Sequence, residues 1–173
     1  MVSLNKQQLR IWAKEERKKL DIETLSAILV RKLQKTEEYL QAKNIMLFYP
    51  LEYEINLLEL LKDATKNFYL PKISGENLLC CPYKEGDKLC ESCFKTKEPL
   101  TEPIEESIID LVIVPALAVD KNNYRLGYGG GFYDRLLAKM KKTIKVACIP
   151  KEFIIDTIYS ESYDESVDKV VSA

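Results

Sequence analysis

Apolar and polar positions follow a helical period in several stretches of the chain. Residues 3–19 are polar and charged with a few apolar anchors, which predicts a largely exposed helix. Asp21 can cap a second helix, because the apolar residues within 25–33 recur at helical spacing. The same period returns in residues 55–65, and a further helix is expected at about residues 132–141.

Short, continuous apolar runs separate these helices and predict buried strands. The runs, each followed directly by a proline, are residues 45–49, 68–70, 108–114 and 144–149. Residues 72–107 contain prolines, glycines and four cysteines and predict short strands and loops. Strands that alternate with helices favour a mostly parallel sheet with helices on both faces. We therefore expect an α/β fold: a single three-layer α/β/α domain over residues 1–173 with a mostly parallel central sheet.

Composition narrows the classes of function. Lys and Arg total 26 and Asp and Glu total 27, so the chain lacks the broad positive charge of a nucleic-acid binder. No apolar run reaches the ~18 residues of a membrane span. Residues 1–20 lack the apolar core of a secretory signal, so we expect a cytoplasmic protein. The chain contains no histidine, which excludes Ser-His and Cys-His nucleophilic pairs and histidine metal ligands.

The five cysteines favour free thiols, because their number is odd. Cys80, Cys81, Cys90 and Cys93 lie close enough in sequence to suggest a zinc site. However, adjacent residues of a strand point to opposite faces, so Cys80 and Cys81 cannot easily bind one ion. We expect no zinc here, and the role of this segment stays open.

A glycine-rich segment after the strongest predicted strand is the most informative part of the sequence. Four of the six glycines lie within residues 127–131, directly before a predicted helix. Glycines allow positive φ angles and let backbone N–H groups converge on an anion, to which the helix N-terminus adds its dipole. Arg125 could bind phosphate, and Asp134 could hold Mg²⁺ beside it. The segment matches neither a Walker A loop nor the dinucleotide-binding fingerprint, and a flexible turn is the alternative interpretation.

The residues around these glycines also resemble a known family. Residues 114–120 and 125–134, read as Val-Pro-Ala-Leu-Ala-Val-Asp and Arg-Leu-Gly-Tyr-Gly-Gly-Gly-Phe-Tyr-Asp, are similar to the signature of 5-formyltetrahydrofolate cyclo-ligases. Lys6 and Arg10 resemble the family's Lys-x-x-x-Arg motif, and residues 49–55 resemble its folate segment. The C-terminal residues 163–171 resemble its closing Asp-x-x-x-Asp segment.

This resemblance implies a set of site residues. Those expected to bind ATP are Lys6, Arg10, Arg125, Gly127, Tyr128, Gly129, Gly130, Gly131, Phe132 and Tyr133. Those expected to bind the folate substrate are Tyr49, Glu54, Tyr128, Gly129, Gly130, Gly131 and Phe132. Asp134 and Asp164 are the expected metal ligands, with Asp168 as a structural partner. Glu52 competes with Glu54 for the role of the carboxylate that binds the pterin.

The resemblance implies ATP-dependent cyclisation of 5-formyltetrahydrofolate to 5,10-methenyltetrahydrofolate, with release of ADP and phosphate. ATP and the folate would be the partners, Mg²⁺ the cofactor, and the enzyme a monomer that binds neither nucleic acid nor membrane. Two alternatives stay open: a non-catalytic regulator that binds nucleotide or folate on the same fold, and a sugar-phosphate enzyme on a similar α/β scaffold.

Overall fold

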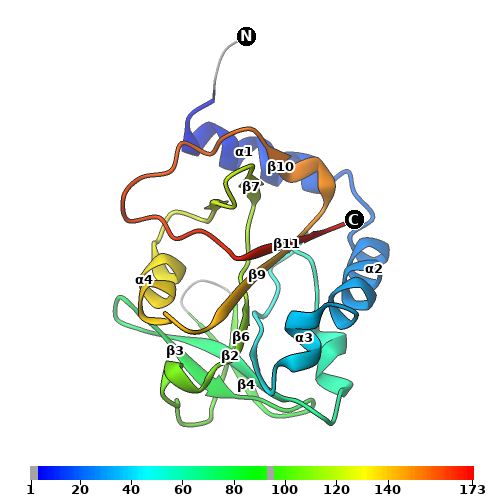
Figure 1. The fold of residues 1–173 in the computed structure, drawn as a ribbon, viewed down its shortest axis with the longest axis vertical. Helices are drawn as coiled ribbons and strands as arrows, with labels where there is room; N and C mark the ends of the chain where they lie inside the picture. The colour runs from blue at the N-terminus through cyan, green and yellow to red at the C-terminus, as the bar shows by residue number, and fades with distance from the viewer. Residues whose placement is uncertain (1–3, 93–95) are drawn as a thin grey trace.

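A six-stranded sheet forms the centre of the protein (Figure 1). The computed structural model describes residues 4–92 and 96–173. In spatial order the strands are β11 (Lys169–Ser172), β9 (Ile144–Ile149), β6 (Leu111–Ile113), β1 (Asn44–Met46), β2 (Asn67–Ser74) and β3 (Asn77–Pro82). Neighbouring strands are parallel, except that β2 and β3 form an antiparallel hairpin. The predicted α/β fold with a mostly parallel central sheet is confirmed.

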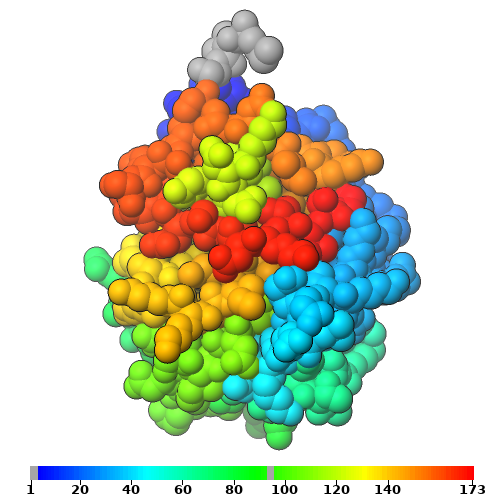
Figure 2. Space-filling model, in the orientation of Figure 1, coloured from blue at the N-terminus to red at the C-terminus, as the bar shows by residue number. Residues whose placement is uncertain are grey.

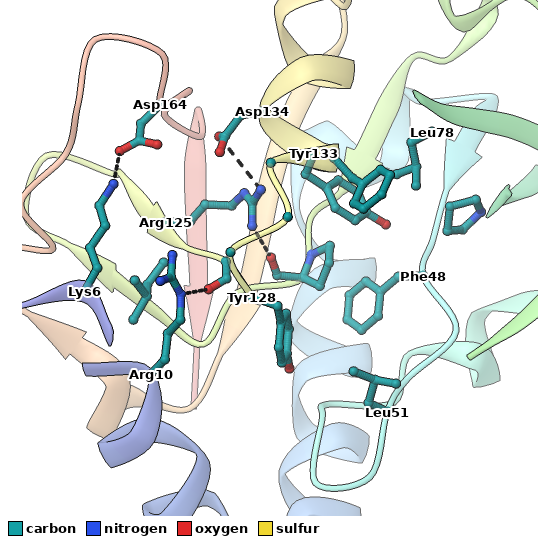
Figure 3. Close-up of a pocket in the computed structure, with 18 of the residues that line it drawn as sticks. Lys6, Arg10, Phe48, Leu51, Leu78, Arg125, Tyr128, Tyr133, Asp134 and Asp164 are labelled. Carbon is teal, nitrogen blue, oxygen red and sulfur yellow. Dashed lines mark hydrogen bonds and ion pairs between the residues drawn. The ribbon is translucent and has the colours of Figure 1, made fainter. Parts of the chain in front are cut away.

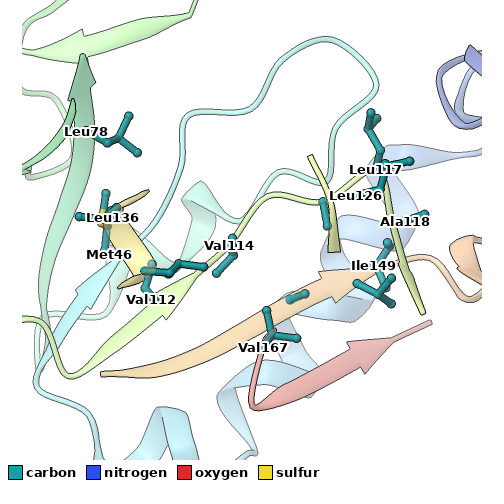
Figure 4. Packing of buried hydrophobic residues seen from close by; sticks show 14 of the residues in the cluster. Met46, Leu78, Val112, Val114, Leu117, Ala118, Leu126, Leu136, Ile149 and Val167 are labelled. Atoms are coloured by element: carbon teal, nitrogen blue, oxygen red, sulfur yellow. The ribbon is translucent and has the colours of Figure 1, made fainter. Parts of the chain in front are cut away.

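Helices cover both faces of this sheet. In the described chain they are α1 (Lys6–Arg17), α2 (Ile22–Gln34), α3 (Glu37–Gln41) and α4 (Phe132–Lys139). Successive residues of β6 point to opposite faces: Val112 joins an apolar cluster with Leu136 of α4, and Leu111 joins a second cluster with Leu29 of α2. Figure 4 shows the first cluster, in which Val112 and Leu136 lie beside Met46 of β1. Helices α1 and α4 therefore cover one face of the sheet, and α2 and α3 cover the other.

Polar side chains fix where the first two helices begin. The Asn5 side chain accepts a hydrogen bond from the Gln8 N–H at 2.8 Å, and the Gln8 side chain accepts one from the Asn5 N–H at 3.0 Å. Asp21 accepts from the Thr24 N–H at 3.2 Å, so the predicted cap of the second helix is confirmed. The first of these caps matters for the site, because it places the next residue, Lys6, at the start of α1.

Shorter strands form two further sheets. A second sheet has the order β10 (Ile154–Ile155), β7 (Ala118–Asp120) and β8 (Arg125–Leu126), and a two-stranded sheet joins β4 (Leu89–Glu91) to β5 (Lys97–Pro99). Short 3₁₀ helices are found at Leu58–Lys62, Glu106–Ile108 and Lys151–Phe153. The sequence predicted short strands and loops for residues 72–107, and the described part of that segment agrees; Cys93 lies outside the described residues.

The helix predicted for residues 55–65 is wrong. The structure has only the 3₁₀ helix Leu58–Lys62 there. The Asn56 side chain accepts a hydrogen bond from the Leu58 N–H at 2.9 Å, and the Asn56 N–H donates to the Ser26 hydroxyl, so neither N–H follows an α-helical pattern. Ile55, Leu57 and Leu60 are nevertheless buried in the apolar cluster that contains Leu29 of α2, and Leu58 and Leu61 pack against that cluster, which explains why the spacing looked helical.

Two predicted strands are shorter than the apolar runs that indicated them. Of the run at 45–49, only Ile45 and Met46 lie within β1, and Phe48 and Tyr49 line the cavity described below. The run at 108–114 begins in a 3₁₀ turn and forms a strand only at Leu111–Ile113. The ends of an apolar run therefore do not mark the ends of a strand: Ile108 is exposed in the 3₁₀ turn, whereas the N–H of Val114, just beyond β6, still donates to the Val146 carbonyl.

The C-terminal strand β11 closes the sheet beside β9 (Figure 2, red beside orange). Lys32 of α2 donates to the Ser172 carbonyl at 2.9 Å, which holds this helix against the end of the chain. Among the described residues, no helix is long and apolar enough to span a membrane.

Candidate active site

The glycine-rich loop lies between β8 and α4. Gly129 and Gly131 have φ angles of 105° and 72°, which disfavour any residue with a Cβ atom. Gly131 is the N-cap of α4 and has no side chain to cap it, so the first N–H groups of the helix face the loop without that partner. A Cβ at Gly127 would lie 2.7 Å from Nη1 of Arg125. Gly129 and Gly131 therefore allow the backbone conformation of the loop, and Gly127 allows Arg125 to approach it closely.

Arg125 is buried directly beneath this loop. Its Nη1 donates to the Pro115 carbonyl at 3.0 Å, and its Nη2 lies 3.8 Å from Oδ1 of Asp134. Burial lowers the pKa of the guanidinium, and the charges of Asp134, Tyr133 and Asp164 act in the opposite direction. Nε has no hydrogen-bond partner in the described structure. The residue is a fixed cation with donor capacity left over for an anion.

Helix α1 brings two more cations to the loop from the other end of the chain. Nε of Arg10 donates to the Gly127 carbonyl at 2.8 Å. Lys6, one turn earlier, places Nζ 2.6 Å from Asp164 and 3.5 Å from Glu161. Burial lowers the pKa of Lys6, but hydrogen bonding and charge attraction from Asp164 outweigh it, so the pKa is raised overall. Figure 3 shows Lys6, Arg10 and Arg125 converging on one side of the cavity.

The two predicted metal ligands, Asp134 and Asp164, both accept hydrogen bonds from backbone N–H groups within residues 161–165. Oδ1 of Asp134 accepts from the Glu165 N–H at 3.1 Å, and Oδ2 of Asp164 accepts from the Glu161 N–H at 2.8 Å. Within the described residues no group of three or more His, Cys, Asp or Glu side chains could hold a metal by itself. A cation bound here would need ligands beyond the protein, as Mg²⁺ does when phosphate and water complete its octahedron.

The other end of the cavity is mostly apolar and contains one buried carboxylate. Glu54 is only 7% exposed, and its Oε1 accepts from the Leu51 N–H at 2.7 Å. Burial raises the pKa of Glu54, although the Leu51 N–H, the Tyr128 hydroxyl and the charge of Arg17 oppose the shift. Glu52 is exposed and does not line the cavity, so the geometry favours Glu54 as the carboxylate at this end.

Tyr133 stands between the two ends. Its hydroxyl is buried with no hydrogen-bond partner in the described structure, and its ring lies 5.3 Å from the Arg125 guanidinium. An unpaired buried hydroxyl is costly, so this group is suited to a polar atom of a bound ligand. Figure 3 shows the ring beside Leu78 and across from Phe48.

All these groups line one cavity of about 770 Å³. The size is within the range of small-molecule sites. The structure brings together every site residue predicted from the sequence: Lys6, Arg10, Tyr49, Glu54, Arg125, Gly127, Tyr128, Gly129, Gly130, Gly131, Phe132, Tyr133, Asp134 and Asp164. Asp168 lies outside the cavity and accepts from the Lys145 N–H at 2.8 Å, as a structural partner would.

Sequence reasoning missed part of the lining. The additional residues include Asn5, Gln7, Phe48, Leu51, Leu78, Glu98, Tyr159, Glu161 and Tyr163. Leu51 lies in the same segment as Tyr49 and Glu54, so its neighbourhood was a usable signal. Glu161 and Tyr163 lie in an irregular segment with no period, and only the structure shows that they face Lys6.

Comparison with known proteins identifies the family. The model of the 5-formyltetrahydrofolate cyclo-ligase family matches residues 2–173. The chain belongs to the 5-formyltetrahydrofolate cyclo-ligase family. The predicted family is confirmed, and this membership supports the enzymatic prediction over a non-catalytic regulator.

Individual relatives agree with this assignment. A 5-formyltetrahydrofolate cyclo-ligase of Haemophilus influenzae is 36% identical over 111 residues, which is 58% of this chain and 58% of that protein. The enzyme of the same name from Escherichia coli strain K12 is 31% identical over 142 residues, 76% of this chain and 78% of that protein. The solved structure of Aquifex aeolicus 5,10-methenyltetrahydrofolate synthetase superposes with a TM-score of 0.84 at 29% identity, covering 96% of this chain and 89% of that one.

Proposed function

We propose that this chain closes the ring of 5-formyltetrahydrofolate to give 5,10-methenyltetrahydrofolate, at the expense of ATP, in the cavity described above. Besides family membership, one observation supports this most. A single cavity joins an end rich in cations and backbone N–H groups to an apolar end with a buried carboxylate. The first suits a triphosphate and the second a reduced pterin, and the reaction requires both in contact.

The nucleotide phosphates would bind at the glycine loop. The N–H groups of Gly129 to Gly131 and the N-terminus of α4 provide donors, and Arg125 provides the buried positive charge. Lys6 and Arg10 would close over the phosphates from α1. Phosphoryl transfer requires mainly positioning and charge neutralisation, which suits a chain without histidine.

Mg²⁺ would be held by Asp134 and Asp164, together with phosphate oxygens and water. These residues fit the ion, because two carboxylates beside a phosphate site are its usual protein ligands. When bound, Mg²⁺ would neutralise the charge of the phosphates. Asp164 forms an ion pair with Lys6, so the proposed metal ligand lies directly beside a cation that could also bind phosphate.

The pterin would occupy the apolar end, with Glu54 accepting two N–H bonds from its amino-pyrimidine edge. Tyr49 and the ring of Tyr133 would enclose the ring system. This orientation directs the formyl group toward the glycine loop. The γ-phosphoryl group then passes to the formyl oxygen, N10 attacks the activated carbon and loses its proton, and phosphate leaves.

The cysteine thiols bear on the cellular setting of the protein. Cys80, Cys81 and Cys148 are buried free thiols, and Cys90 is an exposed free thiol. Free thiols persist in a reducing compartment, which supports a cytoplasmic location. We also propose a monomer, because the site residues predicted from the sequence all lie together within a single copy of the chain.

The direct test is to mix the protein with ATP, Mg²⁺ and 5-formyltetrahydrofolate and to follow the near-ultraviolet absorbance of the methenyl product. Product should appear only with all three present, in proportion to the ADP formed. A protein that binds ATP and folate without forming product would be the non-catalytic regulator, and the proposal would be wrong.

A further inference from the structure

An exposed tyrosine lies at the rim of the cavity beyond the phosphate-directed cations. Tyr163 is 64% exposed, more than any other large apolar or aromatic side chain in the described residues. It lines the same cavity as Arg125 and Asp134. None of the roles proposed above uses it. An exposed aromatic ring that borders a ligand cavity indicates a contact surface for a flat ligand group.

The backbone that presents this ring is well anchored. Residues 161–164 form a turn in which the Asp164 N–H donates to the Glu161 carbonyl at 3.0 Å and the Glu161 N–H donates to Asp164 Oδ2 at 2.8 Å. Nζ of Lys6 contacts both acidic side chains and lies 5.7 Å from the centroid of the Tyr163 ring. The ring is therefore held beside a cation assigned to ATP phosphate, and its exposure is not that of a loose tail.

The order of groups along the cavity decides which ligand part reaches this ring. Figure 3 shows Lys6 and Asp164 on one side of Arg125, with Phe48, Leu78 and Leu51 on the other. The folate occupies the apolar side in the proposed function. A triphosphate at the glycine loop must then direct its nucleoside away from that side, past Lys6 and toward Tyr163.

We propose that Tyr163 is the platform on which the adenine base of MgATP stacks. Tyr159 is also exposed and lines the same cavity. This inference rests on the proposed function, since it takes ATP to be the nucleotide. Every nucleobase has an aromatic face, so stacking supplies affinity without requiring hydrogen bonds to the base. The ring face is the determinant here, and the phenolic hydroxyl is dispensable.

The test compares MgATP with magnesium tripolyphosphate, which has the phosphates and no base. Dissociation constants are measured by titration calorimetry for wild type, Tyr163→Leu, Tyr163→Phe and Leu40→Ala. Leu40 is a matched control, because it is 59% exposed on α3 and lies outside the cavity. We expect Tyr163→Leu to weaken MgATP binding about 5-fold or more, the lower range for one base stacked on an aromatic ring. Tyr163→Phe and the control should bind MgATP as wild type does, and tripolyphosphate binding should be equal in all four proteins.

Three outcomes would overturn the platform. MgATP affinity could be unchanged in Tyr163→Leu, tripolyphosphate affinity could fall as much as ATP affinity, or Tyr163→Phe could lose as much as Tyr163→Leu. An equal fall in tripolyphosphate affinity would mean that Tyr163 supports the structure of the turn. An equal loss in Tyr163→Phe would mean that its hydroxyl, and not its ring face, binds ATP. The proposed function is judged separately by wild-type turnover: binding without methenyl product would refute ring closure and leave the platform standing. Wild type that does not bind MgATP would refute both.

Discussion

At the scale of single residues, the site holds two buried charges at opposite ends of one cavity. Arg125 is positive beneath the phosphate loop, and Glu54 is the carboxylate of the apolar end. Burial disfavours the charged form of each, lowering the pKa of Arg125 and raising that of Glu54. Each buried charge therefore destabilises the unliganded protein. A phosphate bound near Arg125, or N–H donors bound at Glu54, would offset part of that destabilisation.

For Glu54→Gln we expect folate affinity to fall about 10- to 100-fold, the scale for losing hydrogen bonds to a charged group, with MgATP affinity unchanged. Glutamine retains an oxygen that can accept from the Leu51 N–H, so the local backbone should hold. Calorimetric titration with 5-formyltetrahydrofolate and with MgATP gives both values. Unchanged folate affinity would remove Glu54 from the site.

The same variant makes a pH prediction. A carboxyl group with a raised pKa in the folded state binds more protons there, so its contribution to stability is greatest at acid pH and is lost as pH rises through the folded pKa. Glu54→Gln should therefore have a higher unfolding temperature than wild type at neutral pH. The difference should shrink as pH falls toward the ordinary carboxyl pKa. Thermal melts at several pH values test this, and a variant less stable than wild type at neutral pH contradicts it.

For Arg125→Ala we expect turnover to fall at least ~100-fold, the scale for removing one preorganised electrostatic contact. The change also leaves the Pro115 carbonyl without its donor, so circular dichroism and the unfolding temperature must be measured beside the steady-state rate. Arg31→Ala, an exposed arginine of α2 outside the cavity, is the matched control. Wild-type turnover in a folded Arg125→Ala protein would show that the loop is assigned wrongly.

At the scale of elements, the phosphate site is made by the junction of β8, the glycine loop and α4. The strand ends with Arg125 and Leu126, and the helix begins after Gly131 with no side-chain cap. The intervening backbone has positive φ angles at Gly129 and Gly131, and residues 127–131 all line the cavity. We therefore expect the conformation of the loop, more than any one side chain, to determine nucleotide binding.

Gly129→Ala tests this directly. An alanine at φ 105° is strained although its Cβ would make only an ordinary contact with Arg10, so we expect the loop to shift and MgATP affinity to fall by about 10-fold or more. Gly86→Ala is the matched control, because its φ is 91°, no atom lies within 4 Å of the added Cβ, and it is outside the cavity. The control should lose stability to a similar extent and keep its MgATP affinity. Equal MgATP affinity in both variants would contradict a role of the loop conformation in nucleotide binding.

The sequence predicted the site residues more accurately than the bounds of the helices and strands. The glycine loop was found because residue type itself reports backbone conformation there. The helix predicted at residues 55–65 was wrong, because burial in the apolar cluster on the α2 side of the sheet produces the same spacing as a helix, and Asn56 diverts the hydrogen bonds. Asp164 was predicted as a site residue but its neighbour Tyr163 was not, because an irregular segment has no period and the partner of Tyr163, Lys6, lies far away in the sequence.

At the scale of the whole molecule, segments from opposite ends of the sequence complete the site. Lys6 of α1 pairs with Asp164, 158 residues later, and Arg10 donates to Gly127, 117 residues later. These contacts tie the first helix and the C-terminal segment to the glycine loop. A ligand that binds all three segments at once should therefore stabilise the global fold and not only a local loop.

Thermal unfolding with MgATP measures this coupling. Ligand at 100 times its dissociation constant adds about 2.7 kcal/mol to the folded state, which for a chain of this size corresponds to a rise of about 5–10 °C. ATP with EDTA, and MgATP with Asp134→Asn, should give a much smaller rise. EDTA removes the ion that offsets the charges of Asp134 and Asp164 near the phosphates, and Asp134→Asn removes one of the two carboxylates expected to hold that ion. Mg²⁺ alone should have little effect, since two carboxylates without phosphate make a weak site. An equal rise in unfolding temperature with EDTA present would mean that ATP binds without the metal ion. No rise under any condition would mean that the loop does not bind a triphosphate, and the proposed reaction would lose its phosphoryl donor.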